Sequence, residues 1–94
     1  MNKRELVRAM ANRMGDKRAA NEAVDAVVDT IEQAVAGGER VTISGFGVFE
    51  RIERPARFAR NPSTGERIRV EETSVPRFRP GSDFKARVRD SRSS

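Results

Sequence analysis

The sequence predicts an α+β fold: a helical hairpin, a three-stranded antiparallel sheet with a long β-ribbon arm, and a short C-terminal helix. Apolar residues recur at helical spacing within residues 1–40, and short runs bounded by glycine and proline follow in residues 41–81. The 94-residue chain has five phenylalanines but no cysteine, tryptophan or tyrosine. Its own core is therefore thin, and disulfides cannot reinforce it. We expect oligomerisation to supply the missing stability.

Two helices are expected in residues 1–40. Asn2 and Glu5 resemble a capping box at the start of the first helix, and Gly15 is placed to end it. Asp16 can cap the second helix, which Gly37–Gly38 ends. The apolar stripe of the second helix consists of Val24, Val27, Val28, Ile31, Ala34 and Val35. A hairpin of two such helices cannot cover all of this stripe, so the remainder must meet a sheet or another subunit.

The first two strands are expected at residues 41–43 and 46–54. Phe46 and Phe49 are three positions apart, which breaks the alternation of a regular strand. We therefore expect a bulge or twist near Gly47.

The ribbon arm is expected where residues 54–60 pair with residues 67–71 across the turn Asn61–Gly65. Pro55 cannot donate to a ladder, so the chain there lies at a sheet edge or has left the sheet. An isolated ribbon is marginal in water, so we expect the arm to be mobile in the free protein. Residues 74–79 are expected to return as the third strand.

The chain is predicted to end in a short helix over residues 84–89, capped by Ser82 or Asp83, and a frayed tail over residues 90–94. We interpret residues 1–94 as one domain. Its expected parts are a helical base at 1–40, the sheet at 41–81 with the arm at about 52–74, and the C-terminal helix and tail at 82–94.

The net charge of +5 is confined to the second part of the chain. Residues 1–40 hold seven basic and seven acidic side chains, whereas residues 41–94 hold 12 basic and 7 acidic ones. Sixteen of the 19 cations are arginine, which binds phosphate in a forked geometry and inserts into narrow grooves. A localised basic surface of this kind is typical of nucleic-acid binding.

Several other functions are disfavoured by composition. The chain has no histidine and no cysteine, so the usual general base, thiolate nucleophile and soft-metal ligands are missing. We expect no enzyme activity, no catalytic residue, no cofactor and no metal. No run approaches the length of a membrane span, so no membrane partner is expected and a cytoplasmic location is predicted.

Three stretches carry a family resemblance: Gly45–Phe49, Arg57–Gly65 and Val75–Gly81. Together with the N-terminal Met1–Leu6 they resemble the bacterial HU/IHF family of histone-like DNA-bending proteins over essentially the whole chain. The arginine-rich sequence with Thr73–Pro76 resembles an actinobacterial HU. Some of those carry a long basic C-terminal tail, so we expect either a tailless member or a piece of a longer protein.

The resemblance implies that residues 1–94 are one DNA-binding domain of an intertwined dimer. In that dimer, residues 1–40 form the dimerisation base and the arms embrace double-stranded DNA in the minor groove. It implies that Pro62 intercalates between base pairs, as apolar wedges do in architectural proteins of this kind. The other residues expected to contact DNA are Lys3, Arg51, Arg54, Arg57, Arg60, Asn61, Thr64, Arg67, Arg69, Arg79 and Lys85. Those expected in the core or dimer interface are Val28, Ile31, Phe46, Phe49 and Phe78. Bent, nicked or gapped DNA is the expected preference, and the location that the resemblance implies is the cytoplasmic nucleoid.

Some alternatives stay open. The chain could be a site-specific bender of IHF type, or, less favoured, an RNA-binding module. Its partner subunit could be a second copy or a paralogue. Phe58 could pack along the DNA groove or make a contact within the arm.

Overall fold

The computed structural model describes residues 1–93, and the chain divides into two compact units, residues 1–34 and the chain from Val35 onward. The elements are α1 (Lys3–Met14), α2 (Lys17–Ala36), β1 (Val41–Ile43), β2 (Gly47–Arg54), β3 (Arg57–Arg60), β4 (Arg67–Val70), β5 (Thr73–Pro80), α3 (Ser82–Asp90) and the 3₁₀ turn η1 (Ser91–Ser93). The predicted α+β fold class is confirmed. In the described part of the chain, no helix is both long and apolar enough to cross a membrane.

The predicted helix signals act as expected. The Asn2 side-chain oxygen accepts the Glu5 N–H at 2.8 Å and so begins α1. Gly15 ends α1 in the left-handed conformation, at φ 78°, and its N–H donates to the Ala11 carbonyl. Asp16 then caps α2, because its Oδ1 accepts N–H groups from the first turn of that helix. These short-range contacts fix where each helix begins and ends.

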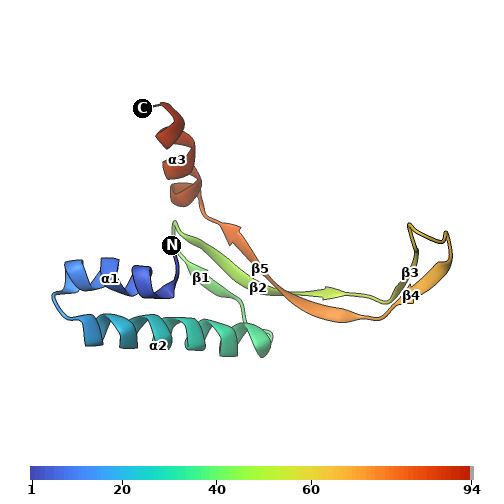
Figure 1. The fold of residues 1–94 in the computed structure, drawn as a ribbon, viewed down its shortest axis with the longest axis horizontal. Coiled ribbons are helices and arrows are strands. Elements are labelled where there is room, and N and C mark those ends of the chain that lie inside the picture. The colour runs from blue at the N-terminus through green and yellow to red at the C-terminus, as the bar shows by residue number, and fades with distance from the viewer. Residues whose placement is uncertain (94) are drawn as a thin grey trace. The chain divides into compact units, whose positions relative to one another are not determined.

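In the first unit, α1 and α2 lie antiparallel and side by side (Figure 1). Val7, Ala20 and Val24 are buried between them, with Met10 and Ala11 packed against this cluster. Further along α2, the apolar stripe is covered unevenly: Val27 and Val28 are 54% and 48% exposed, whereas Ile31 and Ala34 are half-buried and Val35 is buried. The hairpin thus buries only part of its apolar surface.

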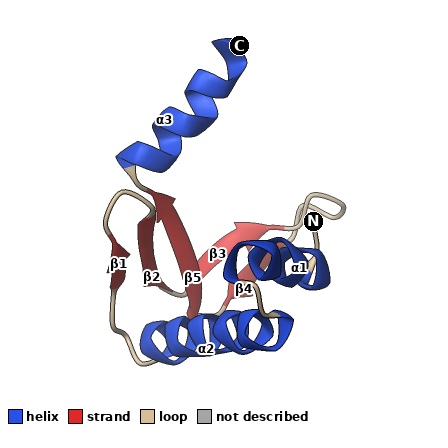
Figure 2. Ribbon diagram, turned by 90° about the vertical axis from the view of Figure 1, so that its left-hand side faces the viewer, coloured by secondary structure: helices blue, strands red, loops and turns tan. Residues whose placement is uncertain are grey.

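In the second unit, β2 is the central strand of a sheet with the order β1-β2-β5, antiparallel to both neighbours (Figure 2). The β2–β5 register runs without interruption from Gly47↔Pro80 to Arg54↔Thr73. The expected bulge near Gly47 is therefore wrong. Phe46 lies in the turn before β2, where its N–H donates to the Ile43 carbonyl, so strand alternation does not apply to it.

Four phenylalanines form an aromatic cluster on this sheet: Phe46, Phe49, Phe78 and Phe84. Phe49 and Phe78 are direct cross-strand neighbours with ring centroids 4.8 Å apart. Phe84 brings α3 into the cluster, because its ring stacks on Phe46 at 5.4 Å. The cluster is still partly open, with Phe46 43% and Phe78 37% exposed.

The start of α3 differs from the prediction. Gly81 is the N-cap residue, and Ser82 and Asp83 lie inside the first turn, so neither of them caps the helix. The Gly81 N–H donates to the Phe46 carbonyl at 2.8 Å, and a Cβ on Gly81 would lie 2.7 Å from the Gly45 carbonyl oxygen. This close backbone approach explains the choice of glycine. Where a frayed tail was expected, residues 91–93 form the 3₁₀ turn η1, and Ser94 lies outside the described residues.

The predicted ribbon is present. β3 and β4 pair antiparallel from Arg57↔Val70 to Arg60↔Arg67 and form a two-stranded sheet of their own. Residues 55–56 and 71–72 link this ribbon to β2 and β5 and lie outside both ladders. Pro55 explains the break on one side, because it cannot donate a backbone hydrogen bond.

Candidate functional site

The tip of the ribbon is a hydrogen-bonded turn. The Asn61 N–H donates to the Glu66 carbonyl at 2.8 Å, and the Gly65 N–H donates to the Asn61 carbonyl at 2.7 Å. Gly65 adopts φ 75°, a conformation that favours glycine. Pro62 lies exposed inside this turn. The turn therefore holds Pro62 at the end of the arm without needing a donor from that residue.

Two side chains predicted to contact DNA help to build this turn. The Asn61 Oδ1 atom accepts the Ser63 N–H at 2.9 Å, which is an Asx turn. The Thr64 hydroxyl accepts the Glu66 N–H at 3.2 Å. Both residues have a structural role at the tip, and their contacts with DNA stay a prediction.

The ribbon presents two different faces. The register and the strand alternation place Phe58, Arg60, Arg67 and Arg69 together on one face. The opposite face carries Arg57 with three apolar residues, Ala59, Ile68 and Val70. Most of the charge of the ribbon is thus concentrated on a single face.

Phe58 makes a contact within the arm. The Arg67 guanidinium lies over the Phe58 ring, 4.1 Å from its centroid, in cation–π geometry. Phe58 is nevertheless 57% exposed, so the stacked pair remains accessible. Of the two alternatives for Phe58, the internal contact is therefore observed.

The other arm arginines differ in how they are held. Arg69 pairs with Glu71 at 2.9 Å, and Arg60 donates to the Gly65 carbonyl at 3.0 Å. The side chains of Arg54 and Arg57 form no hydrogen bond or ion pair within residues 1–93. These two exposed cations are the ones most freely available to an external anion.

Arg51, which was predicted to contact DNA, is engaged inside the second unit. Its Nη1 donates to the Ala36 carbonyl at 2.7 Å, its Nη2 to the Ser74 hydroxyl at 3.0 Å, and its Nε to Glu53 at 2.7 Å. The Ser74 hydroxyl donates to Glu53 at 2.6 Å, and this bond, followed by the charge of Arg51, lowers the pKa of Glu53 against the opposing effect of desolvation. Arg51 thus ties the end of α2 to the sheet.

Lys3 and Lys85, which were both predicted to contact DNA, lie on different units. Lys3 forms an ion pair of 2.5 Å with Asp25 between α1 and α2. Lys85 is exposed on α3 and has no ion pair within residues 1–93. Of the predicted core or interface residues, Ile31 and Phe49 are half-buried, whereas Val28, Phe46 and Phe78 are exposed in the single chain.

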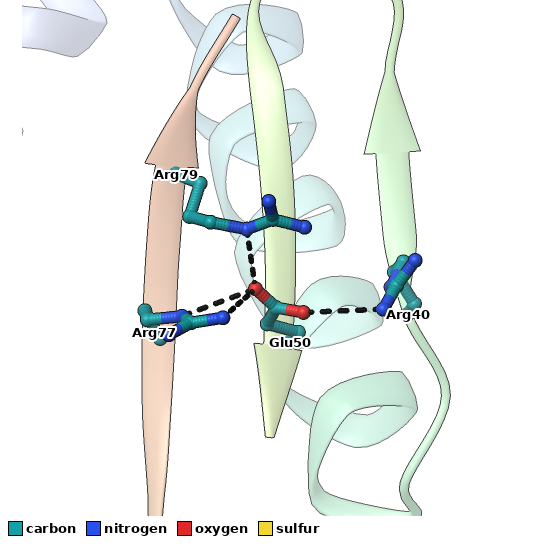
Figure 3. Close-up of polar contacts among 4 residues, drawn as sticks. All are labelled: Arg40, Glu50, Arg77 and Arg79. Atoms are coloured by element: carbon teal, nitrogen blue, oxygen red, sulfur yellow. Dashed lines mark hydrogen bonds and ion pairs between the residues drawn. The ribbon is translucent and has the colours of Figure 1, made fainter. Parts of the chain in front are cut away.

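The main polar site of the sheet surrounds Glu50, a residue that sequence reasoning did not identify. Glu50 is 6% exposed, and its Oε2 atom accepts bonds from Arg79 Nε at 2.6 Å and from Arg77 Nη2 at 2.8 Å and Nε at 3.1 Å (Figure 3). Its Oε1 atom lies 3.4 Å from Arg40 Nη2. The register explains the cluster, because Glu50 is directly opposite Arg77, and Arg79 is opposite Val48. We call Arg40, Glu50, Arg77 and Arg79 the sheet arginine cluster.

The electrostatics of this cluster favour a charged carboxylate. Hydrogen bonding from Arg77 is the largest influence on the pKa of Glu50, which lies below its ordinary value. Burial acts in the opposite direction, and Arg79 adds to the lowering. Sequence reasoning could have proposed the cluster from charges that alternate on neighbouring strands, but only with the register known.

Comparisons with known proteins agree with this architecture. A family model described as "Bacterial DNA-binding protein" matches residues 1–89. DNA-binding protein HU 2 of Streptomyces coelicolor, an actinobacterium, is 55% identical over 92 residues, covering 98% of this chain and 42% of that protein. DNA-binding protein HU of Geobacillus stearothermophilus is 47% identical over 90 residues, covering 95% of this chain and 100% of that protein. The chain thus spans less than half the length of the Streptomyces relative.

Solved structures give the same result. A structure described as a cocrystal of Anabaena HU with DNA matches with a TM-score of 0.84 and 44% identity, covering 94% of this chain and 97% of that one. A Thermotoga maritima HU variant matches with a TM-score of 0.68 and 31% identity, covering 94% of this chain and 99% of that one. The resemblance expected from the sequence motifs is confirmed, and the chain belongs to the HU-type family of bacterial DNA-binding proteins.

Proposed function

We propose that this protein is a non-enzymatic, histone-like nucleoid protein that binds double-stranded DNA through the minor groove with little sequence preference, bending and compacting it. The observation that carries the proposal is the arm tip, where a preformed turn exposes Pro62 beyond a face rich in arginine. Family membership and the likeness to an HU–DNA cocrystal support it. A cytoplasmic, nucleoid location follows from this function.

The physical basis is a balance between DNA deformation and contact. Unstacking one base step costs roughly a few kcal/mol, and the bent duplex offsets this by contacting more protein surface. Proline suits the wedge because it is apolar and rigid and leaves no N–H unpaired among the bases. The arginines of the arm supply the electrostatic part by displacing condensed counterions. Nicked, gapped or already bent DNA should bind better, since its steps cost less to open.

The proposal extends to the remaining predicted contacts. Arg54 and Arg57 have no competing partner within residues 1–93, so they are the simplest candidates for phosphate contacts. Arg60, Arg67 and Arg69 share one ribbon face and would act together. The other proposed DNA contacts are Lys3, Arg51, Asn61, Thr64, Arg79 and Lys85.

We further propose that residues 1–94 act as one domain and that the active species is a homodimer. Val27, Val28, Phe46 and Phe78 remain exposed in the single chain, so both units offer apolar side chains to a partner subunit. A second copy would cover these side chains in an intertwined arrangement, with the two arms projecting toward the same duplex. A paralogous subunit could take the same place.

The test is Pro62→Ala, with Ser63→Ala as the matched control in the same turn. The Ser63 side chain makes no hydrogen bond within residues 1–93, so its removal should leave the tip unchanged. Fluorescence energy transfer between the ends of a labelled duplex reports bending, and titration reports affinity for intact and nicked DNA. Pro62→Ala should keep most of the affinity for intact duplex but lose bending and nick preference.

Arg60→Gln supplies the contrasting result, because a lost cation should weaken binding to every DNA tested. If Pro62→Ala bends DNA as well as the unmodified protein and keeps its nick preference, the wedge role is wrong. In that case Asn61 and Pro62 only form a turn.

A further inference from the structure

The sheet arginine cluster has an unusual distribution of burial. The Glu50 side chain is 8% exposed, whereas the side chains of Arg40, Arg77 and Arg79 are 63%, 50% and 52% exposed. One buried negative charge is therefore surrounded by three positive groups that reach the surface. The cluster keeps a net positive charge that faces solvent.

Hydrogen-bonding capacity is left over in the same cluster. Arg79 uses only Nε toward Glu50, Arg77 uses Nε and Nη2, and Arg40 approaches with a single Nη2 atom. The remaining guanidinium nitrogens have no partner within residues 1–93. Each guanidinium carries five N–H donors in a fixed plane, so fixing one edge also fixes the direction of the others.

A contribution to folding stability does not by itself explain why a buried carboxylate is surrounded by three arginines. A buried ion pair often contributes no more to stability than well-packed apolar residues of similar volume. What the carboxylate does supply is order, because long arginine side chains on an open sheet otherwise sample many rotamers. Arginines that are already ordered lose less entropy when they bind an anion.

We propose that Glu50 is a positioning residue that holds Arg40, Arg77 and Arg79 as one preorganised phosphate site on the sheet, separate from the ribbon arm. Its ligand is the phosphodiester backbone of DNA, which guanidinium groups match in geometry and charge. This inference rests on the proposed function and deepens it, because it adds contacts from the body of the sheet. Arg77, Arg40 and Glu50 are the residues it newly assigns.

The first experiment measures how the affinity for a long intact duplex depends on salt. Arg77→Gln is compared with Arg13→Gln, which removes another exposed charge, from the last turn of α1. If Arg77 meets one phosphate, its loss should make the slope of log K against log salt shallower by about one unit. Arg13→Gln should leave the slope unchanged. Equal slopes for the two variants would overturn the site.

The second experiment uses Glu50→Gln, which keeps the size of the side chain and removes its charge. A simple count of charges predicts tighter binding, since a negative group has gone. Positioning predicts the opposite, and we expect the affinity to fall about threefold or more. Unchanged or tighter binding would show that Glu50 does not position the arginines.

A double-mutant cycle completes the test. If Glu50 acts through Arg77, the effect of Glu50→Gln should largely disappear when Arg77→Gln is already present, whereas independent sites give additive effects. Circular dichroism checks that each variant is folded, and Arg77→Gln alone still decides the site if Glu50→Gln does not fold. The proposed function is judged separately: it fails if the unmodified protein shows no salt-dependent duplex binding, whereas binding with unaltered slopes defeats only this inference.

Discussion

At the residue scale, Glu50 and Pro62 show two ways in which neighbouring groups determine the role of a side chain. Glu50 is buried among arginines, so its charge is part of the structure of the sheet. Pro62 is exposed in a turn whose hydrogen bonds are made by its neighbours. The first residue is fixed by partners far away in the chain, and the second by residues next to it. A change at Glu50 should therefore alter the pH dependence of stability, whereas a change at Pro62 should alter DNA bending.

For Glu50 we predict a specific pH dependence of stability. Its pKa is lowered in the folded protein, so the unfolded chain binds more protons in acid and folding is disfavoured there. The contribution is complete above the ordinary glutamate pKa of about 4.3 and is lost as the pH falls through the lower folded value. Urea denaturation should show that the unmodified protein is more stable than Glu50→Gln at pH 7, and that this difference in stability decreases as the pH falls to 3.

Glu53 provides the control, because the Ser74 bond and Arg51 lower its pKa in the same direction. Glu53→Gln should remove the contribution of Glu53 to the loss of stability in acid. It should leave unchanged the stability difference between proteins with and without Glu50→Gln. Parallel loss of stability in the unmodified protein and Glu50→Gln at all pH values would contradict the role assigned to Glu50.

At the element scale, β2 organises the second unit. One of its faces carries Phe49, which meets Phe78, and the other carries Glu50, which meets the arginines. This is the consequence of strand alternation in a central strand with a neighbour on each side. The close pairing of β2 with β5 at Gly47 holds both faces in register. A Cβ on Gly47 would lie 2.6 Å from the Arg79 carbonyl oxygen and still closer to the Phe78 ring.

We therefore predict that Gly47→Ala is costly. The added methyl group meets backbone as well as a ring, so the two strands must separate, at about 2–3 kcal/mol of stability. Gly38→Ala is the matched comparison: Gly38 has φ 90°, but a Cβ there would meet nothing within 4 Å, so only conformational strain of about 1 kcal/mol is expected. Chemical denaturation measures both, and equal losses would show that the strand contact is unimportant.

At the scale of the whole molecule, apolar surface and charge are distributed unequally. The helical hairpin leaves Val27 and Val28 open, and the aromatic cluster leaves Phe46 and Phe78 partly open. The excess positive charge, by contrast, lies in residues 41–94. Such a chain has one kind of surface suited to a second subunit and another suited to a polyanion. The proposed homodimer uses both.

We predict that Val28→Glu prevents dimer formation. Val28 is 48% exposed in the single chain, so a glutamate there is tolerable in a monomer but would be buried without a partner in an interface. Ala26→Glu places the same charge at an exposed position on the opposite side of α2 and should leave the dimer intact. Sedimentation equilibrium measures the oligomeric state of both variants. If the unmodified protein is a folded monomer at micromolar concentration, the proposed dimer is refuted.

The sequence by itself determined the features that depend on neighbouring residues. The Asn2 and Asp16 caps, the Gly15 stop, the tip turn at Asn61–Gly65 and the break at Pro55 all follow from contacts within a few positions. The location of the excess charge is also a property of the sequence alone. These signals were sufficient to predict the order of the elements and the arm.

Only the tertiary structure decided the features that join distant residues. Glu50 and Arg79 are 29 positions apart, and only the β2–β5 register places them together. The sequence also did not predict the hydrogen bonds of Arg51 to Ala36 and Ser74, the stacking of Phe84 on Phe46, or Gly81 as the N-cap of α3. The physical reason is common to all of them: local propensity fixes an element, but partners across a sheet are fixed by register and backbone approach, which the linear pattern does not encode.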